Sequence, residues 1–77
     1  MSYHATTVDL STAERAQLRA ARERLGLSQT AVGHRAGCTY AMICYIESGA
    51  KSPSYGLLAA ICAALGLELR LKLVKKR

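Results

Sequence analysis

The first third of the chain has apolar residues at helical spacing. A narrow apolar stripe at positions i, i+3 and i+7, which we expect to face inward, consists of Leu18, Ala21 and Leu25. Ser11 and Glu14 have the spacing of a capping box, in which each side chain satisfies a free backbone N–H at the start of a helix. The pattern predicts a helix over residues 12–25 that ends at Gly26, with the charged residues, Arg15 among them, on the remaining faces.

Three further segments have the same helix signals. Each follows a Ser or Thr whose side chain can accept a hydrogen bond from a free N–H, and each ends at or next to a glycine. The predicted helices cover residues 29–36, 40–48 and 55–65, after the caps Ser28, Thr39 and Ser54. Gly33 lies inside the first of them, at a cost of about 1 kcal/mol relative to Ala, and permits close approach of another backbone. The residues predicted to face the core are Ile43, Ile46, Leu58, Ile61, Cys62 and Leu65.

Residues 25–53 have the layout of a helix-turn-helix. Two of the short predicted helices lie in this stretch, joined by a tight turn that contains Gly37. Such a unit holds its second helix in the major groove of DNA. The pattern therefore makes DNA binding the leading functional hypothesis.

The period of the pattern changes after Gly66. Apolar and charged residues alternate without a break, which is the strand pattern, and the four leucines on one face are Leu67, Leu69, Leu71 and Leu73. A single strand leaves its backbone groups unpaired. We therefore expect this strand to pair with the same strand of a second copy, which makes the protein a homodimer. A helical alternative for the segment stays open.

The length and composition indicate one small domain. The chain has 77 residues with no Trp and no Phe, so Leu, Ile and Ala must supply the core. Such a core leaves a thin stability margin, which dimerisation would increase. We expect a flexible lead-in at residues 1–10, a helix-turn-helix DNA-binding domain at 11–66, and a strand and basic tail for dimerisation at 67–77. No apolar run approaches the roughly 20 residues that span a bilayer, so we expect no membrane partner.

The chain is basic, with a net charge of +6 and a pI of about 9.7. Positive charge gathers in the first third and the last eight residues, and between Gln29 and Gly66 the only full positive charges are Arg35 and Lys51. This balance suits an anionic partner such as nucleic acid. Two alternatives stay open, namely a solvated basic surface without a partner and a basic tail that serves solubility and protects a strand edge.

The cysteine content predicts neither disulfides nor a metal site. An odd count of three, Cys38, Cys44 and Cys62, without a signal peptide points to a reducing cytoplasm. The sequence has no CxxC or HxxxH spacing, and a glycine separates His34 from Cys38. We expect packed or partly exposed thiols, with a metal or redox site as the minor alternative.

Ten positions show a resemblance to a known family. They are Leu27, Ser28, Gln29, Ala36, Gly37, Ile43, Ile46, Glu47, Gly49 and Pro53. With these in register, residues 15–66 resemble the Cro/C1-type (XRE) helix-turn-helix family, because the L-S-Q opening, the A-G turn and the I-x-x-I-E-x-G exit occur together. The resemblance implies an all-α, lambda-repressor-like bundle of four or five helices. It also implies a sequence-specific transcriptional regulator, usually a dimeric repressor on a palindromic operator.

The resemblance also assigns site residues by position. Gln29 matches the family residue that anchors a DNA phosphate and supports the recognition helix, although it can alternatively stabilise only the start of its own helix. Lys51 and Ser52 lie in the loop that typically meets backbone phosphates. Glu47 matches a structural acid, and we expect it to pair internally with Arg22. The recognition-helix residues expected to enter the groove are Thr39, Tyr40, Ala41, Cys44 and Tyr45.

The expected reading face departs from the family pattern. Family members usually present Gln, Arg, Ser or Asn, which can make bidentate contacts with base edges. Here the face presents Tyr40, Ala41, Met42, Cys44 and Tyr45. We therefore expect direct readout that is weaker or directed to A·T pairs, with more reliance on DNA shape. Two alternatives stay open: the tyrosines only cover the surface, or the face has given up DNA and binds protein.

A bundle followed directly by one strand is similar to the layout of HipB-type antitoxins. That similarity implies an alternative function, an antitoxin that binds a partner toxin, with or without repression of its own operon. An enzyme is not expected, because five carboxylates and two histidines form no evident nucleophile–base pair and no glycine loop is suited to phosphates. The expected partners are double-stranded operator DNA and a second copy of the chain, and no cofactor or metal is expected.

Overall fold

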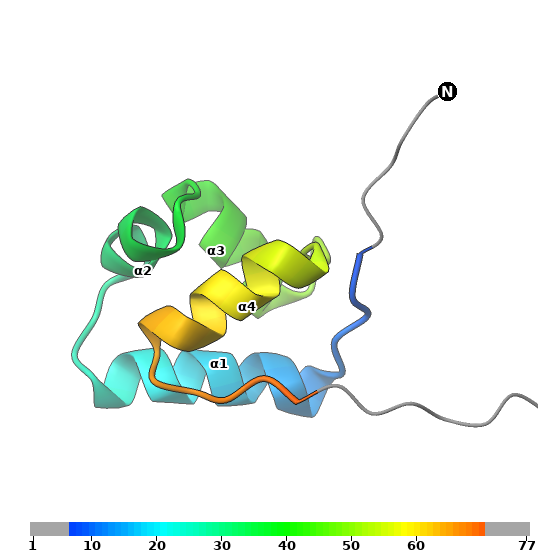
Figure 1. Ribbon diagram of the computed structural model, residues 1–77, viewed down its shortest axis with the longest axis horizontal. Helices are drawn as coiled ribbons and strands as arrows, with labels where there is room; N and C mark the ends of the chain where they lie inside the picture. Colours follow the sequence, from blue (N-terminus) through cyan, green and yellow to red (C-terminus); the bar gives the residue numbers. More distant parts are fainter. Residues whose placement is uncertain (1–6, 71–77) are drawn as a thin grey trace, which may run out of the picture.

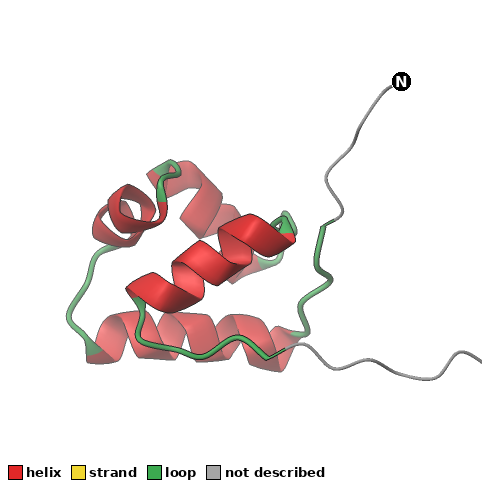
Figure 2. Cartoon of the chain, viewed as in Figure 1, coloured by secondary structure: helices red, strands yellow, loops and turns green. Residues whose placement is uncertain are grey.

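The computed structural model describes residues 7–70 and contains four α-helices in that part of the chain (Figure 1, Figure 2). They are α1 (Thr12–Arg24), α2 (Gln29–Ala36), α3 (Tyr40–Ser48) and α4 (Tyr55–Ala64). All four predicted helices are confirmed, and α1 and α4 each end one residue earlier than expected. The all-α class is confirmed as well.

Each helix begins at the predicted cap. The Oγ of Ser11 accepts a bond of 3.1 Å from the Glu14 N–H, while the Ser11 N–H donates to Glu14 Oε1 at 2.8 Å, which completes the capping box. Ser28, Thr39 and Ser54 accept equivalent bonds of 3.0, 3.1 and 3.2 Å from the third residue of their helices. Local side-chain chemistry therefore sets where α1–α4 start.

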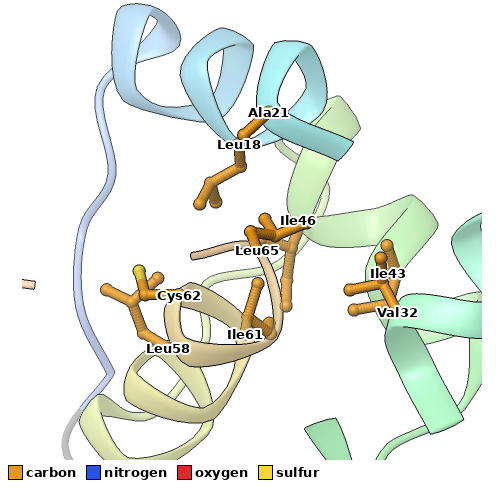
Figure 3. Packing of buried hydrophobic residues seen from close by; sticks show 9 residues of the cluster. All are labelled: Leu18, Ala21, Val32, Ile43, Ile46, Leu58, Ile61, Cys62 and Leu65. Atoms are coloured by element: carbon orange, nitrogen blue, oxygen red, sulfur yellow. The ribbon is translucent and has the colours of Figure 1, made fainter. Parts of the chain in front are cut away.

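The hydrophobic core lies between α1, α3 and α4 and extends to α2 (Figure 3). In the chain, α2 packs against both α3 and α4, and α1 packs against α3. The buried apolar residues are Leu18, Ala21, Val32, Ile43, Ile46, Leu58, Ile61, Cys62 and Leu65. The residues of α3 and α4 that were predicted to face inward are all in this set, which fixes the opposite side of α3 as its outer face.

Two predictions for α1 are wrong. Leu25 is 50% exposed instead of buried, because it is the C-cap residue of α1 and the chain turns away from the core at Gly26. Leu27, just beyond the turn, packs against the core instead. Arg15 is buried, with only 9% of its surface exposed, since it lies one helical turn before Leu18 on the inward face.

The described ends of the chain pack against the helices. Thr7 forms a single antiparallel bridge with Ser54, and the Val8 N–H donates to the carbonyl of Pro53 at 2.7 Å. After α4, residues 67–70 run beside α1 without regular secondary structure (Figure 1). Leu67 and Leu69 pack against the core of their own chain.

The predicted C-terminal strand is not seen in the described residues. Residues 67–70 form no strand in the single chain, and Leu71 and Leu73 lie outside the described part. Strand pairing across a dimer therefore stays a proposal. Between residues 7 and 70, no helix is long and apolar enough to cross a membrane.

Candidate DNA-binding surface

The turn between α2 and α3 holds the two helices in close contact. Gly37 ends α2 in the left-handed conformation at φ 79°, and the Cys38 N–H donates to the carbonyl of Gly33 at 2.8 Å. A Cβ atom on Gly33 would lie 2.9 Å from the Cys38 carbonyl oxygen and 3.1 Å from the carbonyl carbon of Thr39. The predicted close approach of a second backbone is confirmed, and it fixes the start of α3 against α2.

An ion pair fixes the other end of α3. The Nε and Nη2 atoms of Arg22 on α1 donate to the two carboxylate oxygens of Glu47 at 2.7 and 3.0 Å, and Nη1 donates to the Leu27 carbonyl at 3.0 Å. Only 13% of the Arg22 side chain and 9% of the Glu47 side chain is exposed. The hydrogen bonds to Glu47 raise the pKa of Arg22 above its ordinary value. The predicted pairing of Glu47 with Arg22 is confirmed.

Gln29 joins the start of α2 to α3 through both ends of its amide. Its Nε2 donates to Glu47 Oε1 at 3.2 Å, and its Oε1 accepts a bond of 3.1 Å from the Cys44 thiol. Gln29 therefore contacts α3 directly, in addition to lying in the first turn of its own helix. Its role as a phosphate anchor stays a prediction.

The outer face of α3 holds most of the residues expected to read DNA. Ile43 and Ile46 are buried behind it. In front, Tyr40 is 56% exposed and Tyr45 is 41% exposed. Thr39 is exposed as well, while Ala41 and Cys44 are half-buried. The helix thus presents two phenols beside small side chains and no basic group.

Met42 does not belong to this face. Its side chain is half-buried and packs against the hydrophobic core, so its predicted place among the outward residues is wrong. The cause is position, since Met42 lies four residues before the buried Ile46 and therefore shares its side of the helix. The outward surface is therefore narrower than the sequence indicated.

The loop after α3 lies against the same face. The Lys51 N–H donates to the carbonyl of Tyr45 at 3.2 Å, and the Lys51 Nζ lies 4.8 Å from the centre of the Tyr45 ring. This distance allows a cation–π interaction. Ser52, by contrast, is half-buried, and its Oγ lies 3.4 Å from Nη2 of Arg15. Lys51 is thus the exposed residue of the expected phosphate-contacting pair, and Ser52 faces partly inward.

A polar hollow of about 500 Å³ opens between α1, α2 and α3. Its lining residues are Arg19, Arg22, Ser28, Gln29, Cys44, Glu47 and Ser48. Both carboxylate oxygens of Glu47, the one acid in the lining, accept bonds from Arg22 or Gln29. The lining of the hollow therefore contains no unengaged carboxylate that could act as a general base. Arg19, which also lines the hollow, is exposed.

Cys38 and Cys62 are packing residues, whereas the Cys44 thiol donates to Gln29. Cys62 is buried in the core, and burial raises the pKa of the Cys38 and Cys62 thiols. Thiols with raised pKa are poor nucleophiles at neutral pH. No group of three His, Cys, Asp or Glu residues that could hold a metal ion occurs within residues 7–70.

Sequence reasoning missed one residue next to this surface. Arg15 contacts the carbonyls of Ile46 and Lys51 from inside the fold. Its spacing from Leu18 was the available signal, because a residue at i−3 shares the inward face of the helix. A positive charge at such a position is ordinarily assigned to solvent.

Comparisons with known proteins match the part of the chain that contains this surface. A family model described as a helix-turn-helix domain matches residues 15–72. A curated protein of Sinorhizobium fredii (strain NBRC 101917 / NGR234), named as the uncharacterized HTH-type transcriptional regulator y4dL, is 44% identical over 53 residues. The match covers 69% of this chain and 27% of that relative, so the chain spans about a quarter of its length. No solved structure matches the chain significantly.

Proposed function

The chain belongs to the helix-turn-helix domain family, a family of DNA-binding regulators rather than enzymes, and from that premise we propose that it is a sequence-specific transcriptional repressor. In this proposal α3 enters the major groove and the protein acts as a homodimer on a palindromic operator. One observation supports it above the others. The Arg22–Glu47 pair holds α3 rigidly from behind, while Tyr40 and Tyr45 on its outer face remain exposed.

The chemistry of the outer face favours A·T pairs over G·C pairs. A guanine is usually read by the paired donors of Arg or Lys, and α3 contains neither. The methyl of Ala41 and the rings of Tyr40 and Tyr45 offer apolar contact for the thymine methyl group, and the phenol hydroxyls can exchange hydrogen bonds with base edges or phosphates. We infer that DNA shape supplies part of the specificity.

Phosphate contacts come from residues beside α3 in this proposal. Lys51 is exposed in the loop between α3 and α4, and Gln29 lies in the first turn of α2, where free N–H groups and the helix dipole favour an anion. Ser52 contributes through its backbone rather than its hydroxyl, which faces Arg15. The net charge of +6 supports this electrostatic contribution.

Two copies of the chain would place two α3 helices in successive major grooves, about 34 Å apart. We propose that the alternating segment pairs across the dimer axis, with Leu67, Leu69, Leu71 and Leu73 on one face. Membership of the Cro/C1-type (XRE) branch fits the ten positions of the motif and stands as part of the same proposal.

Fluorescence anisotropy of labelled duplexes tests the proposed function. The purified full chain is titrated into DNA from upstream of its own gene and into an unrelated duplex, each at two salt concentrations. We expect tight and selective binding. The logarithm of the binding constant should fall steeply with the logarithm of the salt concentration, because phosphate contacts release counterions. Equal weak binding to both duplexes would contradict specific recognition.

A repressor also lowers transcription from the bound promoter, which a reporter assay measures. The antitoxin alternative has no contact among residues 7–70 that favours it, and the same experiments treat it as an outcome. Selective DNA binding together with co-purification of the neighbouring gene product would add that function. Co-purification without DNA binding would replace the repressor by a protein-binding module.

A further inference from the structure

Arg15 is a buried charged residue, and no carboxylate among residues 7–70 pairs with it. A buried guanidinium without an acidic partner is unusual, because removing a charge from water is costly. Groups other than carboxylates must therefore compensate the burial of the Arg15 guanidinium.

Oxygen atoms of the chain satisfy Arg15 instead. Nη1 donates to the carbonyls of Ile46 at 2.6 Å and Lys51 at 2.9 Å. Nε donates to the Leu10 carbonyl at 3.2 Å, and Nη2 lies 3.4 Å from the Oγ of Ser52. A single side chain on α1 thus binds the last turn of α3, the loop that follows it, and the segment before α1.

The electrostatics and the packing both suit a cation here. Ile46 lies in the last turn of α3, where the helix dipole is negative and carbonyls lack partners within the helix. A Cβ built on Gly49, which ends α3 at φ 92°, would lie 3.9 Å from the Arg15 side chain, an ordinary contact distance, so the glycine turn lies beside Arg15.

The loop held in this way leads to the outer face of α3. The Lys51 carbonyl accepts from Arg15, the Lys51 N–H donates to Tyr45, and the Lys51 ammonium lies over the Tyr45 ring. We propose that Arg15 is a positioning residue for DNA binding: from inside the fold it holds Lys51 against Tyr45, and so aligns a phosphate-binding cation with the recognition helix. This inference rests on the proposed function.

Only arginine suits the task. The planar guanidinium donates in three directions at once, whereas a lysine ammonium is a compact point charge on a flexible stem. Arg15→Lys therefore keeps the buried charge but loses the fork that joins Ile46, Lys51 and Leu10. If Arg15 only stabilised the fold, the charge of Lys51 would act on DNA independently of Arg15. If Arg15 positions Lys51, the effect of Lys51 on DNA binding depends on Arg15.

A double-mutant cycle on the full chain separates the two roles. DNA affinity is measured against salt concentration for wild type, Arg15→Met, Lys51→Ala and the double variant. We expect Lys51→Ala to reduce the salt slope by about 0.9, the value for one phosphate contact. In the Arg15→Met background we expect Lys51→Ala to change the slope little, because Lys51 is already displaced.

Arg24→Met with Lys51→Ala provides the matched control cycle, since it removes an exposed arginine from the same helix. We expect the control pair to be additive. If Arg15→Met and Lys51→Ala are additive too, Arg15 does not position Lys51 and the proposal is overturned. Should Arg15→Met fail to fold, Arg15→Lys replaces it in the same cycle, and additivity there overturns the proposal equally.

Proton NMR of the free protein gives a readout that does not depend on DNA. The Nζ of Lys51 lies over the Tyr45 ring, so we expect the methylene protons next to it to be shifted upfield. We expect Arg15→Met and Arg15→Lys to abolish this shift and Arg24→Met to preserve it. A shift that survives in the Arg15 variants overturns the positioning role, whereas its loss in a protein that binds no DNA rejects only the proposed function.

Discussion

Arg22 and Glu47 form a two-point ion pair that joins α1 to the last turn of α3, with nitrogen–oxygen distances of 2.7 and 3.0 Å. The pair also receives Gln29, so three helices meet at one carboxylate. We expect Glu47→Ala to destabilise the fold by about 3 kcal/mol, because it leaves a largely buried guanidinium without its partner. Urea denaturation followed by circular dichroism measures the loss.

The double variant Arg22→Met/Glu47→Leu is the control for that change. Replacing both members of a buried pair by apolar residues is often close to neutral, so we expect the double variant to regain much of the stability. A double variant less stable than Glu47→Ala would show that packing around the pair matters more than its charge.

Gly33 and Gly56 offer a matched pair of helical glycines. A Cβ on Gly33 would meet the Cys38 carbonyl oxygen at 2.9 Å, whereas a Cβ on Gly56 would meet nothing within 4 Å. We expect Gly33→Ala to lower the melting temperature, because overpacking costs about 1–3 kcal/mol and exceeds the gain in helix propensity. Gly56→Ala should be neutral or stabilising by up to about 1 kcal/mol. Thermal unfolding of both variants tests the contrast, and equal shifts would contradict the close approach of α2 to the turn.

Tyr40 tests the placement of the reading face. Since its side chain is 56% exposed, we expect Tyr40→Ala to change stability by no more than about 0.5 kcal/mol. In the proposed function it should nevertheless alter the sequence preference, which selection from a random duplex library would measure. Tyr55→Ala is the control, because Tyr55 is 48% exposed on α4, outside the helix-turn-helix. Unchanged affinity and preference in Tyr40→Ala would place the reading face elsewhere.

The capping box gives a pH-dependent contribution to stability. Hydrogen bonds from the backbone N–H and the hydroxyl of Ser11 hold the pKa of Glu14 below its ordinary value. The ionised carboxylate therefore stabilises the folded state above the ordinary pKa, and that stabilisation is lost as the pH falls through the lowered value. Glu14→Gln keeps a capping side chain but removes the charge. We expect its urea midpoint to lie below wild type at neutral pH and to converge with it as the pH falls through the lowered pKa of Glu14. A difference that does not change with pH would contradict the role of the charge.

The proposed dimer is tested by sedimentation equilibrium of the full chain. We expect a dimer for wild type and a monomer for Leu71→Glu/Leu73→Glu, because like charges at the centre of a strand pair repel. These positions are preferable to Leu67 and Leu69, which already pack on the core of their own chain. A stable dimer in the charged variant would remove strand pairing from the proposal.

Local signals made most of the fold predictable. The caps at Ser11, Ser28, Thr39 and Ser54 depend only on residues three positions away, and all of them form as expected. The glycine inside α2 was also informative, because a costly residue in a helix interior needs a reason in the packing. The family resemblance supplied the pairing of Glu47 with Arg22.

The errors come from contacts between distant parts of the chain. Two acceptors of Arg15 are carbonyls 31 and 36 residues away, which no local pattern reveals. Leu25 continued the apolar stripe but lies where the chain leaves the helix. For the site, the sequence predicted that Gln29 begins the second helix and that Ser52 lies in the loop after the third, and both positions are confirmed. It could not show that an amide would bridge to Glu47 or that a hydroxyl would face a buried guanidinium.

Among residues 7–70, no aromatic ring lies in the core, and this has an optical consequence. The chain has no Trp and no Phe, and the three tyrosines in the described residues, Tyr40, Tyr45 and Tyr55, are all exposed, while Tyr3 lies outside them. The emission and near-ultraviolet dichroism of these three tyrosines will therefore report events at the surface of α3 and α4 and respond weakly to loosening of the aliphatic interior. In the proposed function, these tyrosines would report DNA binding without an added label. Unfolding must be followed by the circular dichroism of the backbone.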